Sequence, residues 1–268
     1  MSDTTAVVAC FNYGAYLREA VDSLLSQEGG APHVVVVDDG STDPGTHAAL
    51  DALPDEVEVL RQANAGVVAA RNAGLARACT PYVVFLDADD RLAPGALAAM
   101  RRALEGAPDA GFAYGHQRFF GAWEGVMRFP PYDPLRLLDR HLIGLTTLAG
   151  REVLEDTGGF DPAFEAFEDW ELWLNALAHG HRGVLVDAVT LEYRRHAESK
   201  VGGDRRAYRR TRRHLREKHA RLYASRAALA RESSLGPAGR LLYRFYWGPR
   251  PLPARVERAL YDLAFARR

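Results

Sequence analysis

The stretch YVVFLDADDRLAPG (residues 82–95) carries an apolar run directly into three carboxylates within four positions. Its first five residues are continuous, apolar and rich in valine and aromatic residues, which is typical of a strand buried on both faces. Asp87, Asp89 and Asp90 follow where the chain leaves that strand. Like charges this close repel one another, so each carboxylate requires water, a cation or a hydrogen-bond donor. The stretch therefore predicts a buried strand that ends at a polar site.

Three further apolar runs precede this strand, and helical patterns separate the runs. The strands are expected over residues 6–10, 33–37 and 57–60, and the helices over 16–27, 44–53 and 67–79. This β-α-β-α-β-α-β order predicts a doubly wound α/β sheet, whose ligands bind beyond the carboxyl ends of the strands. Polar, loop-forming residues follow all four runs, so we expect a binding site at that edge of the sheet.

Composition places the chain among globular proteins and gives no reason to expect a nucleic-acid partner. It has 268 residues, with 34 Lys and Arg against 35 Asp and Glu. Cys10 and Cys79 show no CxxC or CxxH spacing, so reduced thiols are expected. We find no signal peptide pattern and no apolar run of the ~18 residues that span a bilayer. These features predict a cytoplasmic protein, or a peripheral one at the inner face of the membrane.

Six segments, in order and spacing, resemble the inverting family 2 glycosyltransferases of the GT-A fold. They are FNY (11–13), VVVVDDGSTD (34–43), NAGVVAARNAGLA (64–76), VVFLDADD (83–90), GGFDPAFEAFEDWELWL (158–174) and LEYRRH (191–196). The resemblance covers roughly residues 5–196. It implies a Rossmann-like mixed sheet flanked by helices and a nucleoside-diphosphate sugar as donor, with UDP as the expected nucleotide.

The resemblance assigns the Asp cluster and a distant histidine to the sugar nucleotide and its cation. Asp87 is expected to face the ribose and Asp89 to bind Mn²⁺ or Mg²⁺, while Asp90 caps the following turn. These hard cations accept one or two carboxylates together with substrate phosphates. His196 is expected on the metal or the diphosphate, since neutral imidazole is a competent ligand. Without the resemblance, a surface position for this histidine and a loop role for the aspartates would be the ordinary interpretation.

The same resemblance places five residues at the nucleotide. Phe11 stands where relatives often carry a Tyr that stacks on the base, so stacking is retained and the hydroxyl is lost. Asn12 follows it, and Asp39 is expected to accept the ring N–H of the base. Asn64 shapes its loop and is a candidate nucleotide contact, and Arg71 is a candidate for the base or the diphosphate. The alternatives are a turn built by Asp39 and its neighbours, and an ordinary solvated Arg71.

Asp169 is the expected catalytic residue. In the family, the Asp of this Glu168-Asp169 pair is the general base that takes a proton from the acceptor hydroxyl. The alternative is that both carboxylates are simply favoured in the first turn by the helix dipole. Trp170 and Trp173 have the spacing of a core-facing stripe.

Domain boundaries follow from the extent of the resemblance and from charge. We predict a glycosyltransferase domain over 1–196, with a nucleotide-binding half (1–90) and an acceptor half (91–196), followed by a basic helical extension over 197–268. The basic residues of that extension suit a solvated helix face, or a patch for anionic lipid, a polyanionic acceptor or a partner. Peripheral membrane association and a homodimer contact are both open for it.

The expected activity is metal-dependent transfer of a sugar, with inversion, to a hydroxyl of a glycan, lipid-linked or small-molecule acceptor. Rival interpretations are a nucleotidyltransferase of related fold and a degenerate nucleotide-binding or scaffold protein. A phosphatase of the haloacid dehalogenase type is disfavoured, because its nucleophilic Asp would follow the first strand and not the fourth. The sequence identifies neither the sugar nor the acceptor.

Overall fold

The computed structural model describes residues 2–164, 166–197 and 205–247. Its contacts divide the chain into two compact units. The first comprises the chain up to Tyr132 together with Leu142–His219, and the second comprises Asp133–His141 together with the described residues from Ala220 onward. The predicted domain end at residue 196 falls inside the first unit, and the division of the chain by function stays a prediction.

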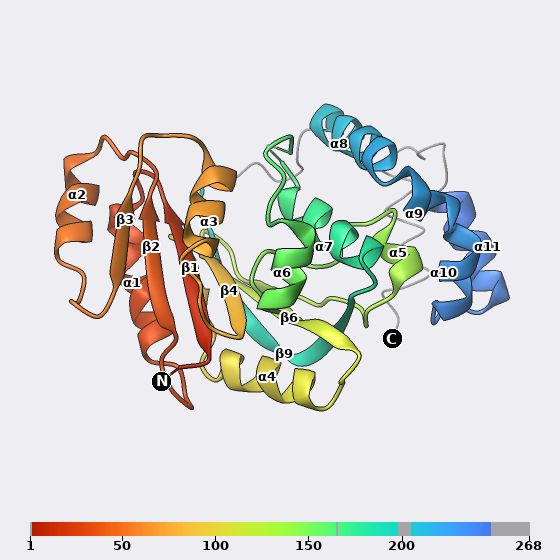
Figure 1. Cartoon of the computed structure of the whole chain (residues 1–268), viewed down its shortest axis with the longest axis horizontal. Coiled ribbons are helices and arrows are strands. Elements are labelled where there is room, and N and C mark those ends of the chain that lie inside the picture. Colours follow the sequence, from red (N-terminus) through yellow and green to blue (C-terminus); the bar gives the residue numbers. More distant parts are fainter. Residues whose placement is uncertain (1, 165, 198–204, 248–268) are drawn as a thin grey trace. The chain divides into compact units, whose positions relative to one another are not determined.

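The first unit is built on a mixed sheet. Its strands in the described residues are β1 (Thr4–Cys10), β2 (His33–Asp38), β3 (Glu58–Arg61), β4 (Tyr82–Asp87), β5 (Arg91–Leu92), β6 (Ala110–Gly121), β7 (Gly125–Met127), β8 (Thr147–Gly150) and β9 (Arg182–Arg195). They run in the order β3-β2-β1-β4-β8-β6-β9-β5, with β7 paired to β6. Figure 1 shows the neighbouring strands β3, β2, β1 and β4. β1 to β4 are mutually parallel, so their carboxyl ends meet at one edge as predicted.

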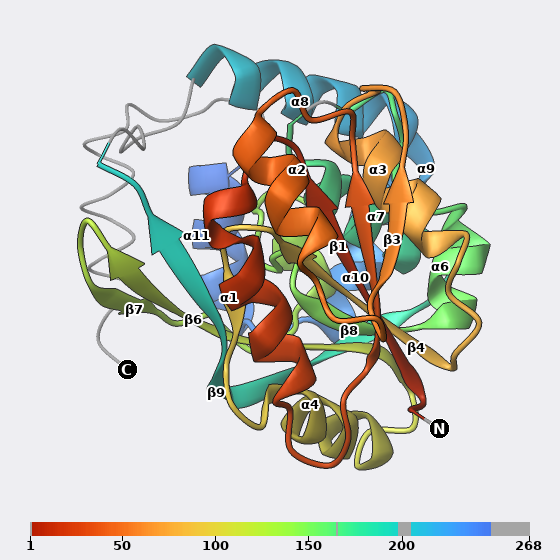
Figure 2. The ribbon, with the colours of Figure 1, turned by 90° about the vertical axis from the view of Figure 1, so that its left-hand side faces the viewer.

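Helices cover both faces of the parallel strands, because alternate strand residues point to opposite faces. Val8 and Val36 are buried with Leu17 of α1 (Gly14–Leu25) and with α4 (Ala96–Glu105). Val35 and Val37 are buried instead with Ala70 of α3 (Val67–Leu75). Figure 2 shows α1 and α3 on different sides of the strands. The predicted mixed α/β sheet flanked by helices is confirmed.

Most of the remaining helices follow β4 in the sequence. They are α2 (Pro44–Asp51), α5 (Pro134–Leu137), α6 (Arg151–Thr157), α7 (Glu168–Ala178), α8 (Arg205–Lys218), α9 (Ala220–Ala224), α10 (Arg226–Glu232) and α11 (Pro237–Trp247). Sequence patterns did not predict β8 or α6, because both are short and carry no clear periodicity. α5 is a single short turn that ends at Leu137, and β9 runs without a break from Arg182 to Arg195.

The second unit forms around α5, a short internal segment. The buried carboxylate of Asp133 accepts hydrogen bonds from the Leu135 amide (3.0 Å) and from the Ser233 hydroxyl (2.7 Å). Tyr223 donates its hydroxyl hydrogen to the Leu138 carbonyl (2.5 Å), and Tyr243 donates to the Arg136 carbonyl (2.6 Å). The C-terminal helices therefore hold a segment that belongs to the middle of the sequence.

The basic helix α8 is packed against α7 along one side. The carboxylate of Glu171 in α7 is fully buried and contacts Lys218 Nζ (2.7 Å) and His219 Nε2 (2.9 Å) through the same oxygen. His214 stacks on Phe164 with ring centroids 4.3 Å apart. Part of the basic stretch is thus packed inside the first unit and stabilises α7. The predicted extension beyond residue 247 lies outside the described residues.

We predict that Lys218→Met lowers the free energy of unfolding by about 2–3 kcal/mol. The substitution removes the lysine cation beside the buried Glu171 carboxylate, and breaking a buried ion pair from one side is strongly destabilising. Arg213→Met on the same helix is the control, because Arg213 is exposed and lies 3.9 Å from Glu217. Urea denaturation would measure both. Equal losses for the two variants would contradict a specific role for the Glu171 contact.

Candidate functional site

The loops after β1 and β2 are tied together by one side chain. Asn12 has a positive φ of 58°, which Asn tolerates better than most residues. Its Oδ1 accepts hydrogen bonds from the amides of Thr42 (2.8 Å) and Asp43 (3.0 Å). The Asn12 side chain therefore holds the two loops together. The neighbouring residue, Phe11, is 43% exposed. Phe11 is thus accessible at the edge where the sequence predicts a nucleotide.

Asp39 connects the loops after β2 and β3. Its buried carboxylate accepts hydrogen bonds from Gln62 Nε2 (2.7 Å) and from the amides of Ala65 (2.9 Å) and Gly66 (2.8 Å). The preceding loop comes so close that a Cβ on Gly40 would lie 2.6 Å from the Asn64 amide nitrogen. Asp39 is therefore a carboxylate held in place by backbone donors, and Asn64 is exposed on the loop that supplies them.

Arg71 joins the end of β4 to the start of α7. Its Nη2 donates to Asp87 Oδ1 (2.7 Å), and its Nη1 donates to Glu168 Oε1 (2.5 Å). The Arg71 side chain is only 6% exposed, so the alternative of an ordinary solvated arginine is wrong. This contact brings the Asp cluster and the Glu168-Asp169 pair to one place.

Charge and burial compete at this contact. Burial by itself would lower the pKa of Arg71, but the charges of Asp87 and Glu168 outweigh burial and raise it above its ordinary value. Burial, followed by the charge of Asp169, raises the pKa of Glu168, and the Arg71 cation opposes that rise. Arg71 therefore stays charged, and its cation offsets the repulsion between the Asp87 and Glu168 carboxylates.

Asp89 and His196, the two residues expected at a metal ion, lie in contact with each other. Asp89 Oδ2 lies 2.8 Å from His196 Nε2, and the Tyr16 ring lies 5.3 Å from the imidazole between centroids. The described residues hold no cluster of three or more His, Cys, Asp or Glu that could bind a metal by themselves. A carboxylate and an imidazole still fit Mg²⁺ or Mn²⁺, because these ions take few protein ligands when substrate phosphates supply the others.

Asp90 has a different role from its two neighbours. It is buried, and its Oδ1 accepts a hydrogen bond from the Arg194 amide of β9 (2.7 Å). Burial, the charge of Asp87 and then that of Asp89 raise the pKa of Asp90 to about 9, although the Arg194 amide opposes the rise. Its carboxyl group thus anchors the cluster to β9, an attachment that the local sequence did not predict.

Asp169 lies in the first turn of α7, as the sequence predicts. Its Oδ1 accepts a hydrogen bond from the Trp170 amide (2.8 Å), and the residue is 9% exposed. The preceding cap residue, Phe167, has a positive φ of 60°, an unusual conformation for a bulky residue. Trp170 and Trp173 are buried, which confirms that they belong to the core.

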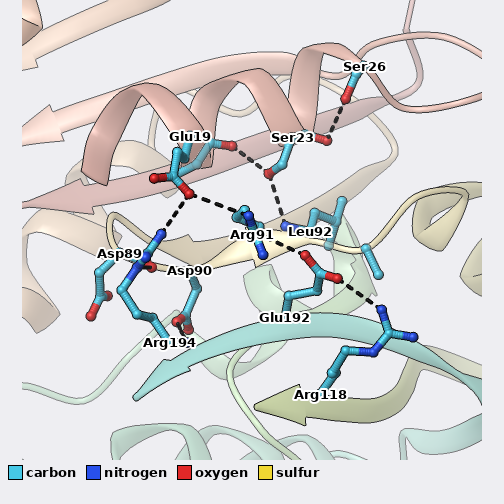
Figure 3. A network of polar contacts seen from close by, with 12 residues as sticks. Glu19, Ser23, Ser26, Asp89, Asp90, Arg91, Leu92, Arg118, Glu192 and Arg194 are labelled. Carbon is cyan, nitrogen blue, oxygen red and sulfur yellow. Dashed lines mark hydrogen bonds and ion pairs between the residues drawn. The ribbon is translucent and has the colours of Figure 1, made fainter. Parts of the chain in front are cut away.

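Sequence reasoning missed a second polar network behind the Asp cluster (Figure 3). Arg194 Nη2 donates to Glu19 Oε2 in α1 (2.7 Å), and Arg194 Nε donates to the Asp89 carbonyl (2.8 Å). Arg91 contacts both Glu19 (3.5 Å) and Glu192 (3.0 Å). Arg194 lies within the LEYRRH segment, but nothing in the local pattern pointed to Glu19.

Comparison with solved structures supports the fold assignment. The chain resembles the structure titled S. aureus TarS 1-349 in complex with UDP-GlcNAc with a TM-score of 0.63 and 19% identity, over 88% of this chain and 67% of that one. The structure of the same fragment in complex with UDP gives a TM-score of 0.62 and 18% identity, over 97% and 75% of the two chains. These likenesses show a GT-A type of fold.

Sequence comparison then gives the family. Residues 5–158 match the model described as Glycosyl transferase family 2, and the chain belongs to this family. It is 41% identical over 111 residues to the succinoglycan biosynthesis protein ExoO of Rhizobium meliloti (strain 1021), covering 41% of this chain and 31% of that protein. It is 30% identical over 216 residues to ExoU of the same organism, covering 69% and 60%.

The chain covers less than a third of the length of several curated relatives. The covered share is 28% for an uncharacterized glycosyltransferase of Nostoc sp. and 31% for ExoO. In the part of this chain that the structure describes, none of the helices has the length and apolar character needed to cross a membrane.

We predict that Arg71→Met destabilises the fold by about 3–5 kcal/mol, because the buried side chain of Arg71 no longer pairs with the partly buried Asp87 and Glu168 carboxylates. Adding Glu168→Gln should recover part of that loss, since one of the two carboxylates is then neutral. A double-mutant cycle measured by urea denaturation would give the coupling energy, which we expect within about 0.5–3 kcal/mol. Strictly additive losses would show that the Arg71-Glu168 contact contributes nothing by itself.

We predict that Asp90 makes stability fall as pH rises. Its folded-state pKa of about 9 lies above its ordinary value of 3.8, so the folded chain binds this proton more tightly. The contribution is therefore full at pH below about 4 and is lost as pH rises toward 9, with a slope of at most about 1.4 kcal/mol per pH unit.

The Asp90→Asn variant keeps the acceptor for the Arg194 amide but cannot ionise. Its stability relative to the unchanged chain should therefore increase between pH 5 and pH 8, measured by denaturation in EDTA. Parallel pH profiles for the two proteins would mean that Asp90 is already ionised in the folded state at neutral pH.

Proposed function

We propose that this chain is a metal-dependent, inverting glycosyltransferase that moves a sugar from a nucleoside diphosphate, UDP being the best-supported one, to an acceptor hydroxyl. The observation that carries the proposal is the Arg71 bridge from Asp87 to Glu168. It brings the carboxylate expected at the donor ribose close to the pair that contains the expected general base.

The relatives support the donor and the kind of acceptor. Solved structures of the TarS fragment contain UDP-GlcNAc or UDP. Curated relatives include a succinoglycan biosynthesis protein and a teichoic acid poly(glycerol phosphate) polymerase. By analogy we propose a nucleotide-sugar donor and an acceptor that is a glycan, a lipid-linked intermediate or a smaller hydroxyl compound used in glycan synthesis.

The nucleotide is proposed to bind across the loops after β1, β2 and β3. Phe11 offers an exposed ring for stacking on the base. Asp39 offers a carboxylate whose position is fixed by backbone amides, so that it can accept a ring N–H from the base. Asn12 and Asn64 shape the same edge, and Asp87, which is 37% exposed on its side chain, is available to the ribose. Arg71 donates a hydrogen bond to Asp87, and its proposed effect on nucleotide binding is to hold that carboxylate in place.

Asp89 and His196 are the proposed ligands of Mn²⁺ or Mg²⁺. Their donor atoms already converge on each other, which suits a pair that would share one ion with the donor diphosphate. Such an ion, when bound, neutralises negative charge that gathers on the departing diphosphate.

Asp169 is the proposed general base. Its neighbour in the sequence, Glu168, is paired with Arg71. Asp169 follows Glu168 in the first turn of α7. The N-terminal end of a helix favours an ionised carboxylate. Asp169 would take the proton of the acceptor hydroxyl as that oxygen attacks the anomeric carbon, in one displacement with inversion.

We predict that Asp169→Asn lowers turnover by about 10²–10⁴-fold, because the amide keeps the shape of the side chain but cannot accept the proton. UDP affinity should stay close to that of the unchanged chain. Calorimetry and a transfer or donor-hydrolysis assay on the same preparation would give both quantities. Glu168→Gln is the matched comparison.

Three other outcomes would change the proposal. Normal transfer by Asp169→Asn with an inactive Glu168→Gln would move the base to Glu168. Loss of UDP binding together with transfer would make Asp169 structural. UDP binding by the unchanged chain without any transfer or donor hydrolysis would favour the rival interpretation, a nucleotide-binding module.

Location and assembly remain proposals. The basic and aromatic composition of residues 239–256 suits peripheral attachment at the inner face of a membrane, or a homodimer contact. Residues 248–256 of that stretch lie outside the described part of the chain.

A further inference from the structure

Arg194 makes two hydrogen bonds to the chain segment that carries the proposed metal ligand. Its side-chain Nε donates to the Asp89 carbonyl (2.8 Å). Its backbone amide donates to the Asp90 carboxylate (2.7 Å). Arg194 also lies two residues before His196 in the sequence. One residue of β9 therefore fixes the Asp89 backbone next to the point where the Asp89 and His196 side chains meet.

The guanidinium of Arg194 is itself held on three sides. Its Nη2 donates to Glu19 Oε2 of α1 (2.7 Å). Its central carbon lies 4.6 Å from the centroid of the Tyr16 ring and 4.4 Å from that of Phe120. The side chain is 14% exposed. A planar cation between two rings, with a carboxylate at one end, has little freedom to move.

We propose that Arg194 and Glu19 are positioning residues for Asp89, and that they set the affinity of the site for its divalent cation. This inference rests on the proposed role of Asp89 as a metal ligand. Residues behind a metal ligand orient it, and their loss typically weakens metal binding by about 10–100-fold. Without the Arg194 guanidinium, the Asp89 carbonyl would lose its donor and the backbone beneath the carboxylate would be less restrained.

Arginine suits this position better than lysine. The Asp89 carbonyl and the Glu19 carboxylate bind different nitrogens of one rigid fork, and the central carbon of that fork lies over the rings of Tyr16 and Phe120. Lysine keeps the charge but presents a single ammonium group on a flexible stem. Arg194→Lys therefore separates the geometry of the guanidinium from its charge.

Figure 3 also provides the matched control. Arg118 on β6 belongs to the same network, where its Nη1 donates to Glu192 (3.1 Å). It has no contact with Asp89 among the interactions drawn, and its side chain is 54% exposed. Arg118→Gln removes a cation from the network and should leave the Asp89 backbone unchanged.

The test is a titration of Mn²⁺ into each protein saturated with UDP, with free Mn²⁺ followed by electron paramagnetic resonance. We expect Mn²⁺ affinity to fall about 10–100-fold in Arg194→Lys, less in Glu19→Gln, and not in Arg118→Gln. UDP affinity in EDTA should be unchanged in all three. Donor hydrolysis by Arg194→Lys should recover as Mn²⁺ is raised, which a general loss of folding would not allow.

Several results would overturn the inference. One is Mn²⁺ affinity in folded Arg194→Lys within twofold of the unchanged chain, and another is an equal fall in Arg118→Gln. If Arg194→Lys does not fold, unchanged Mn²⁺ affinity in Glu19→Gln decides against the inference. If the unchanged chain binds UDP without any metal dependence, the proposed metal role of Asp89 fails first and this inference fails with it.

Discussion

The guanidinium of Arg71 pairs with two carboxylates that reach it from separate parts of the first unit. Asp87 ends the parallel strand β4, and Glu168 begins α7, the helix that carries Asp169. The Glu168 side chain is 15% exposed and that of Asp87 37% exposed. Two partly buried carboxylates that share one neighbour repel each other unless a cation lies there. The two halves of the proposed active site therefore depend on one charge for their alignment.

The loops around this contact are fixed by side chains that bond to backbone. Asn12 and Asp39 bind amides of neighbouring loops, and Asp90 binds the Arg194 amide of β9. Each bond crosses from one strand end to another, so the edge of the sheet is set before any ligand arrives. Such preorganisation lowers the cost of ordering loops when a substrate binds. The basic helix α8 likewise fixes α7 in place, because its Lys218 pairs with the buried Glu171 carboxylate.

The parts of the fold that could be predicted are those in which local pattern and burial agree. Valine-rich runs became β1 to β4, and the spacing of Trp170 and Trp173 placed them in the core. The meeting of Asp89 with His196 followed from the family resemblance and not from local pattern. The partners of Arg71 and the contact from Glu19 to Arg194 could not be predicted, because both depend on the register between distant elements.

The hydrogen bonds that hold the α5 segment to the C-terminal helices have a consequence for the order in which the chain folds. Asp133 leaves the ribosome well before Ser233, its hydrogen-bond donor, and before Tyr243, which binds the Arg136 carbonyl. Domains tend to fold during translation from the N-terminal side. Here the internal segment must wait, with the carboxylate of Asp133 still in water, until the last described helix has emerged. The second unit is therefore completed only after α11 has been synthesised.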